Sequence, residues 1–284
     1  KFGKQQGKYY VPQRAAAGLD PWATPQAYDN AKDFFDTGIT WSNSLNVAQM
    51  LDKSSYSISL GNTHQDGIIS STGMDRYNVK VSADTKLTNN WSSGFTANYI
   101  TTSIDKAVTS GNGLLRTVYA APPSYDLAGI PSHVDGNPYT QNSFRGSFDN
   151  AYWAMDNNKF TEDTNRFFGN VYASYQTDFG TTNHKLNAKY MVGVDAYTTH
   201  YVDSYGYGSN TGGGRGQIEN YGWTNATYNS LLTINYDWRI NEDWGLNAVL
   251  GNEIIQSNRK KYYEYGTNYN FPGWNHINNA TTQQ

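Results

Sequence analysis

The stretch RYNVKVSADTKL at residues 76–87 decides the fold class of this 284-residue chain. Apolar or aromatic side chains alternate along it with polar and charged ones. One face carries Tyr77, Val79, Val81, Ala83, Thr85 and Leu87, and the other carries Asn78, Lys80, Ser82, Asp84 and Lys86. A period of two over this length is typical of a β-strand with one apolar and one polar face.

The same alternation recurs along the chain and predicts eight strands. We expect them at residues 41–51, 55–64, 75–87, 91–102, 165–177, 184–198, 224–237 and 244–258. Short turns at 52–55, 88–90, 180–183 and 241–243 join them in pairs, and long polar excursions join the other ends. Short turns at one end and long loops at the other are typical of a transmembrane β-barrel, with the turns in the periplasm and the loops outside.

Strand length and aromatic placement agree with a membrane. About ten residues at about 3.3 Å each, tilted by about 45°, span about 23 Å, close to the apolar band of an outer-membrane barrel. Aromatic residues next to the short turns form the expected interfacial girdle: Tyr56, Trp91, Tyr175, Phe179, Tyr236, Trp238 and Trp244.

Composition excludes several classes of protein. The formal net charge of -3 leaves no basic stripe for a nucleic-acid partner, and the absence of Cys removes disulfides and thiolate metal sites. No run of eighteen apolar residues occurs, so no membrane-spanning helix is expected. Because Lys1 follows no initiator Met or signal peptide, the start is expected to be a processed or truncated end.

An ordered series of motifs resembles the barrel of SusC/RagA-type TonB-dependent transporters of Bacteroidetes. It begins with AKDFFDTGIT at 31–40, SNSLNVAQ at 42–49 and YSISLGNTHQDGII at 56–69, and it ends with GNEI at 251–254. Between them, residues 150–175 match the family pattern at Asn150, Tyr152, Trp153, Asn157, Asn158, Asn165 and Arg166. Ala151 departs from the pattern, because the family usually has Pro there.

The resemblance implies that the eight strands are part of a larger, 22-stranded barrel in the outer membrane. Residues 1–40 would then lead from an extracellular loop into the barrel, and 41–258 would form strands with loops near 65–74, 103–164 and 199–223. Residues 259–284 would begin a further loop, and the plug and N-terminal domain would lie outside this chain.

The resemblance also implies active import of a large nutrient, an oligosaccharide or a peptide. A SusD-like surface lipoprotein would cover the outer face, TonB would act through a plug segment, and two such units would form a possible dimer. The polar chain end at Gln284 fits this picture, because an open sheet needs further strands to be tolerated in lipid.

The predicted loop 103–164 is the candidate substrate-binding region. Long loops without periodic structure are often binding loops. Aromatic rings with amide neighbours can stack on and hydrogen-bond to sugar rings, and amides with a guanidinium can equally bind a peptide. We therefore predict that the substrate contacts Tyr119, Tyr125, Tyr139, Arg145 and Trp153. The competing interpretation is that these side chains pack the loop against itself or pin it to the barrel rim.

Enzymatic and metal-binding motifs are not found, so we predict no catalytic residues, no cofactor and no metal. The five His lack zinc-ligand spacing, and no GxSxG elbow occurs. The spacing of a calcium-binding loop is not found at the acidic residues Asp156, Glu162 and Asp163. The glycine-rich stretch 206–217 lacks the Lys of a phosphate-binding loop, so we expect this stretch to be a flexible loop.

Two further classes remain open from the sequence. A soluble or surface-exposed glycan-binding β-protein would pack its apolar strand faces against each other. A small, self-closed eight-stranded structural or adhesion barrel would pair the strand at 41–51 with the strand at 244–258.

Overall fold

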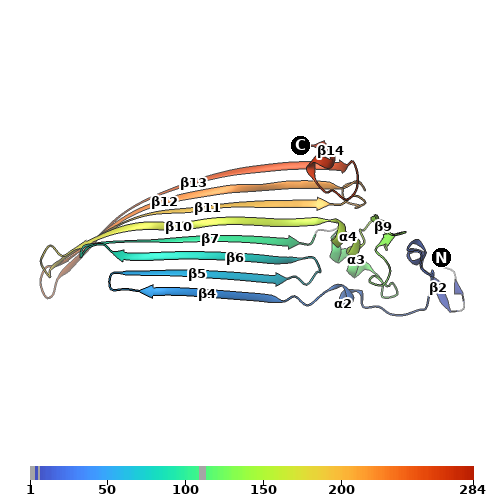
Figure 1. Ribbon diagram of the computed structural model, residues 1–284, viewed down its shortest axis with the longest axis horizontal. Helices are drawn as coiled ribbons and strands as arrows, with labels where there is room; N and C mark the ends of the chain where they lie inside the picture. The colour runs from blue at the N-terminus through green and yellow to red at the C-terminus, as the bar shows by residue number, and fades with distance from the viewer. Residues whose placement is uncertain (1–3, 6, 109–112) are drawn as a thin grey trace.

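A computed structural model describes residues 4–5, 7–108 and 113–284 of the chain. Its main feature is one antiparallel sheet of nine strands in the order β14-β13-β12-β11-β10-β7-β6-β5-β4 (Figure 1). Eight of them are long: β4 Thr40–Met50, β5 Ser54–Asp66, β6 Gly73–Lys86, β7 Trp91–Lys106, β10 Lys159–Thr177, β11 His184–Tyr205, β12 Gln217–Arg239 and β13 Gly245–Tyr269. All eight predicted strands are therefore present, and the all-β antiparallel fold class is confirmed.

The smaller elements lie at the loop end of this sheet (Figure 1). β1 Lys4–Gln5, β2 Lys8–Tyr10 and β3 Trp22–Ala23 form a small N-terminal sheet, and β8 His133–Val134 pairs with β9 Asn137–Gln141. The helices are α1 Pro12–Ala16, α2 Asn30–Phe34, α3 Leu114–Ala120 and α4 Ala151–Asn157, and the 3-10 helix η1 Ile277–Asn279 precedes β14 Ala280–Gln283. In the described part of the chain, no helix is long and apolar enough to cross a membrane.

Polar side chains close three of the four tight turns at the other end, among them Asp178, whose Oδ1 accepts from the backbone N–H of Gly180. Thr88 Oγ1 accepts hydrogen bonds from the backbone of Asn90 and Trp91, and Asn241 Oδ1 does the same for Asp243 and Trp244. Such side-chain acceptors mimic a backbone turn, which is why Thr, Asn and Asp occupy these positions.

The register of the sheet determines how far the strands tilt. The row of paired residues that contains Met50 continues through Ser55, Asp84, Gly94, Tyr172, Met191, Leu231 and Glu253. Beyond this row, toward the tight turns, β6 continues by two residues to Lys86, β10 by five to Thr177 and β12 by eight to Arg239. A stagger of eight residues over six strand spacings corresponds to a tilt of about 40°, the value of a closed barrel.

One face of the sheet carries an apolar band that follows this tilt. It comprises, among others, Leu45, Val47, Ile58, Leu60, Val79, Val81, Phe95, Val171, Val192, Leu232, Ile234 and Leu250. Many of these side chains are exposed, for example Leu45 at 58% and Leu250 at 66%. The band extends about ten residues from the turns, which is about 25 Å along the membrane normal at this tilt.

Aromatic side chains border this band on both sides. Tyr56, Trp91, Trp238 and Trp244 lie exposed at the turn end, and Tyr77, Tyr99, Phe167 and Tyr228 lie exposed at the loop end. Phe179 of the predicted girdle is exposed in a turn, whereas Tyr175 packs on Trp91 with a ring separation of 5.0 Å. Two aromatic belts around an apolar band are typical of a barrel wall in a bilayer.

The opposite face is polar, and several of its charged side chains have partners. Arg166 and Asp195 form a two-pronged ion pair with distances of 2.8 Å and 2.6 Å. The hydroxyl of Tyr172 donates to Asp84 at 2.6 Å, and Asn229 donates to Glu253 at 2.7 Å.

The strands extend further at the loop end than the sequence predicts. The prediction of a loop from 259 is wrong, because β13 continues to Tyr269. In the same way, β10 already begins at Lys159, β11 continues to Tyr205, and β12 already begins at Gln217. The loops therefore shrink to 107–158 and 206–216. Beyond the apolar band both faces carry polar and aromatic residues, so alternation no longer marks the strand.

Two alternatives disagree with this architecture. A self-closed eight-stranded barrel needs β4 to pair with β13, but in the described residues these strands lie on opposite sides of the sheet. A soluble sandwich needs the apolar face to be covered, but Leu45, Ile58, Val171 and Leu250 on that face are 45–66% exposed.

A charge in the middle of the apolar band tests the membrane assignment. We expect Val171→Lys to destabilise the inserted barrel by about 2–4 kcal/mol, because a cation on the lipid face is costly at the bilayer midplane. The control is Asn170→Lys, whose side chain projects from the polar face of the same strand. The folded fraction in outer-membrane extracts, measured by heat-modifiable gel mobility, is expected to fall only for Val171→Lys. Equal behaviour of the two variants would contradict the assignment.

Candidate functional site

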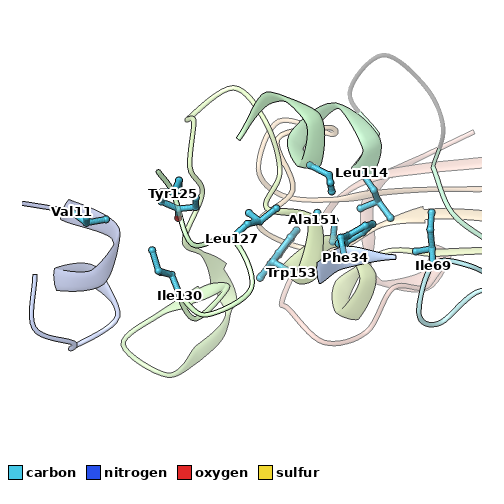
Figure 2. Close-up of a cluster of buried hydrophobic side chains, with 11 residues drawn as sticks. Val11, Phe34, Ile69, Leu114, Tyr125, Leu127, Ile130, Ala151 and Trp153 are labelled. Carbon is cyan, nitrogen blue, oxygen red and sulfur yellow. The ribbon is translucent and has the colours of Figure 1, made fainter. Parts of the chain in front are cut away.

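The loops at the end of the sheet opposite the tight turns enclose a hydrophobic core (Figure 2). Phe34 from α2, Leu114 and Val118 from α3, Leu127, and Trp153 from α4 are all buried in it. The indole Nε1 of Trp153 donates to the carbonyl oxygen of Pro138 at 2.8 Å, so the polar atom of this side chain is satisfied inside the core. The described part of loop 107–158 is thus a folded cap and not an open coil.

This core accounts for two of the sequence-predicted binding residues. Trp153 is 1% exposed and Tyr125 is 7% exposed, so both act in packing, as the competing interpretation held. Burial raises the pKa of Tyr125 to about 12, and its hydroxyl has no hydrogen-bond partner in the described part of the chain. The Tyr125 hydroxyl is therefore neutral at physiological pH and is not available to a ligand in this conformation.

The other three predicted residues lie apart in different surroundings. Tyr119 on α3 is 69% exposed and stands beside Phe35, with 6.3 Å between the ring centres. Arg145 is exposed near the ring of Phe148, and Tyr139 on β9 is half-buried. Tyr119, Tyr139 and Arg145 remain candidate contacts for a ligand.

Asn150 begins helix α4 and ties it to the preceding segment. Its side-chain oxygen accepts from the backbone N–H groups of Tyr152 and Trp153, which caps the helix N-terminus. Its side-chain amide donates to the carbonyl oxygen of Asn142 at 2.9 Å, and its backbone N–H donates to Gln141. The family-like Asn-x-Tyr-Trp motif is thus a structural element of the cap.

Asp149 joins this cap to loop 206–216, and sequence reasoning missed it. Its buried carboxylate accepts from Gln141 Nε2 at 2.7 Å, from Ser209 Oγ at 2.6 Å, and from the backbone and side-chain amides of Asn210 at 2.8 and 2.9 Å. Four donors satisfy the carboxylate without a cation. No sequence signal identifies this residue, because its partners Ser209 and Asn210 lie 60 and 61 residues away along the chain.

The glycine-rich loop 206–216 has a defined path where a flexible segment was expected. Gly208 has a φ of +100°, and a Cβ there would overlap the carbonyl oxygen of Tyr139 and lie 3.1 Å from the Trp153 ring. Gly208 and Gly214 are also joined by a backbone hydrogen bond of 2.9 Å. Glycine lets this loop pack directly against the cap.

Beyond the apolar band, the polar face of the sheet carries an aromatic ladder across neighbouring strands. The Lys106 ammonium lies 4.5 Å from the ring centre of Tyr201, and Tyr201 stacks on Tyr221 at 4.8 Å with an angle of 5°. Lys106 also pairs with Glu162 at 3.5 Å, and Tyr221 donates to Asp203 at 3.0 Å. The rings stack mainly on each other, so the ladder presents edges and hydroxyl groups.

The acidic residues considered for calcium lie apart. Glu162 and Asp163 are neighbours on β10 and therefore point to opposite faces, with Glu162 paired to Lys106 and Asp163 accepting from Ser103 at 2.6 Å. Within the described ranges, no group of three or more His, Asp or Glu side chains could hold a metal ion.

Comparisons with known proteins show similarity of fold. No model of a protein family matches the chain, and no curated protein matches it. Among solved structures, the RagAB peptide transporter matches with a TM-score of 0.74 and 15% identity, over 90% of this chain and 29% of the other. The RagAB peptide importer in its "closed-closed" state matches with a TM-score of 0.69 and 16% identity, over 91% of this chain and 29% of the other. In its "open-open" state it matches with a TM-score of 0.68 and 14% identity, over 92% of this chain and 30% of the other. The chain thus has the fold of part of these proteins and spans less than a third of their length.

Removing the Asp149 carboxylate is expected to release loop 206–216. In Asp149→Ala the amides of Gln141 and Asn210 lose their acceptor, at a cost of about 1–3 kcal/mol for buried donors left unpaired. Hydrogen exchange of the Asn210 backbone amide is expected to accelerate by about tenfold or more. Asp149→Asn keeps an acceptor oxygen and is expected to change less, and Asp156→Ala, on the exposed side of α4, is the surface control. Unchanged exchange in Asp149→Ala would contradict this role.

Two glycines of the same loop form a matched pair. Gly208→Ala is expected to lower the thermal midpoint, because the new Cβ overlaps Tyr139, whereas Gly213 has a φ of +66° but nothing within 4 Å of a Cβ. Gly213→Ala therefore reports the backbone strain alone, of about 1 kcal/mol. If both variants lose the same stability in thermal denaturation, close packing of the loop on the cap is refuted.

Proposed function

We propose that this chain forms part of the wall of an outer-membrane barrel that actively imports a large nutrient, an oligosaccharide or a peptide. The observation that carries the proposal is the tilted apolar band of about 25 Å, bordered by two aromatic belts on a sheet with barrel stagger. The fold shared with the RagAB transporter chains supports it independently.

The open edges of the sheet support a larger barrel. Every residue of β4 from Thr40 to Met50 is exposed, and β13 meets another described strand on its outer side only at β14, near Gly266–Tyr269. Unpaired backbone groups are not tolerated in lipid, so both edges require further strands. The resemblance to SusC/RagA-type transporters supplies them from the rest of a 22-stranded barrel.

The partners follow from the same resemblance. A SusD-like surface lipoprotein would cover the loop end, and TonB would act on a plug segment carried by another part of the protein. The folded cap of loop 107–158 and the interlocked loop 206–216 offer a preformed surface for such a lipoprotein. Two barrel–lipoprotein units would form a possible dimer. Transport, and not catalysis, is the proposed activity.

The intact polypeptide from detergent-extracted outer membranes provides the test. Mass spectrometry is expected to give a mass several-fold above 31.8 kDa, and deletion of the gene is expected to abolish energy-dependent uptake of the cargo. A mass near 31.8 kDa, or recovery in the soluble fraction without detergent, would overturn the proposal. Co-purification with a surface lipoprotein tests the partner separately.

A further inference from the structure

A pair of cations lies on the polar face of β13, well beyond the lipid band. Arg259 pairs in register with Asn225, and Lys261 pairs with Trp223, so all four side chains lie on one face. Lys261 is sixteen residues past Gly245, where about ten residues suffice to cross the apolar band. In the proposed transporter this position is the wall of the outer vestibule, which a cargo passes on entry.

Arg259 is positioned by stacking, and the N–H groups of its guanidinium do not bond to a carboxylate among the described residues. Its guanidinium carbon lies 4.7 Å from the ring centre of Trp223, which is cation–π stacking. The ion pairs among the described residues are His64 with Asp66 and Asp75, Lys106 with Glu162, and Arg166 with Asp195. Arg259 and Lys261 belong to none of them.

Two carboxylates of the same face already have partners. Asp203 accepts from the hydroxyl of Tyr221 at 3.0 Å. Glu162 is paired with Lys106. Asp203 and Glu162 thus have partners, whereas Arg259 and Lys261 belong to no ion pair in the described part of the chain.

Trp223 adds a second sign of a missing acceptor. Its indole Nε1 is buried and has no hydrogen-bond partner among the described residues. Most buried donors in folded proteins are satisfied, so an unmet donor beside two unpaired cations is informative. A carboxylate oxygen would supply the missing acceptor once the side chains that cover Nε1 move aside to admit it.

We propose that Arg259, Lys261 and Trp223 form a subsite for a carboxylate group of the cargo. The planar edge of Arg259 suits two parallel hydrogen bonds to a carboxylate, and Lys261 adds a second positive charge. The carboxylate comes from an acidic sugar of an oligosaccharide or from an acidic side chain or C-terminus of a peptide. The subsite rests on the proposed function, because it needs a cargo to enter the vestibule.

Calorimetric titration of the full-length protein in detergent tests the subsite. The probes are hexagalacturonic acid and maltohexaose for the sugar source, and hexaglutamate and hexaglutamine for the peptide source. Binding of hexagalacturonic acid but not maltohexaose identifies an acidic glycan, and binding of hexaglutamate but not hexaglutamine identifies an acidic peptide. If no acidic probe binds more tightly than its neutral counterpart, the subsite is refuted, whereas the intact mass and uptake still report on transport.

Variants on one strand separate a built site from general charge. The double variant R259Q/K261Q is expected to weaken the acidic probe by about tenfold to a hundredfold, because charge-assisted pairs are lost. Lys260 lies between these residues on the opposite face, so K260Q removes a charge without touching the subsite and is expected to bind as the wild type does. Trp223→Phe keeps a ring under Arg259 but removes the N–H, and a smaller weakening is expected.

The opposite outcomes overturn the subsite. Equal weakening by K260Q and by R259Q/K261Q would mean that only net charge matters. Unchanged affinity in R259Q/K261Q, with correct folding by heat-modifiable mobility, would mean that these cations pair with another strand of the barrel.

Discussion

The constraint on which the structure depends is that every backbone N–H and C=O group must find a partner where no water is present. Within the sheet this is met without interruption, since the register runs continuously from β4 to β13. At the two edges it is not met by this chain. Because the apolar band reaches both edges, their unpaired backbone groups would face lipid, which cannot hydrogen-bond to them as water would. The proposal of further strands thus rests on the same feature that indicates the membrane.

The regular stagger also fixes the depth of each side chain. Paired residues on neighbouring strands do not lie at the same depth along the membrane normal. Relative to one row of paired residues, each tight turn lies two to three residues further along the strand than the turn of the preceding hairpin. This explains why Ile254 still belongs to the apolar band while Gln256 and Asn258 on the same face are polar. The strands also lengthen, from 11 residues in β4 to 25 in β13, so the later strands rise far above the band.

Sequence reasoning succeeded where lipid imposes a pattern and failed where it does not. Within the band, one face must be apolar and the other is polar, so alternation located all eight strands. Above the band, Tyr201, Tyr221 and Trp223 occupy strand positions that look like loop, because water accepts polar residues on both faces. In the loops, composition alone does not distinguish an aromatic residue that packs from one that binds. Tyr125 and Trp153 are core residues, and Asp149, which links two loops, carries no local signal at all.

The chemistry of the vestibule wall follows from how its rings are used. The stacked faces of Tyr201 and Tyr221 and the Trp223 ring under Arg259 already have partners, so stacking on a sugar would compete with contacts that hold the wall together. What remains accessible are hydroxyl groups, ring edges and the guanidinium edge of Arg259. In the proposed transporter, such a wall would discriminate by charge and hydrogen bonding more than by aromatic stacking. Selectivity would then depend on groups that belong to no ion pair among the described residues, such as Arg259 and Lys261 on β13.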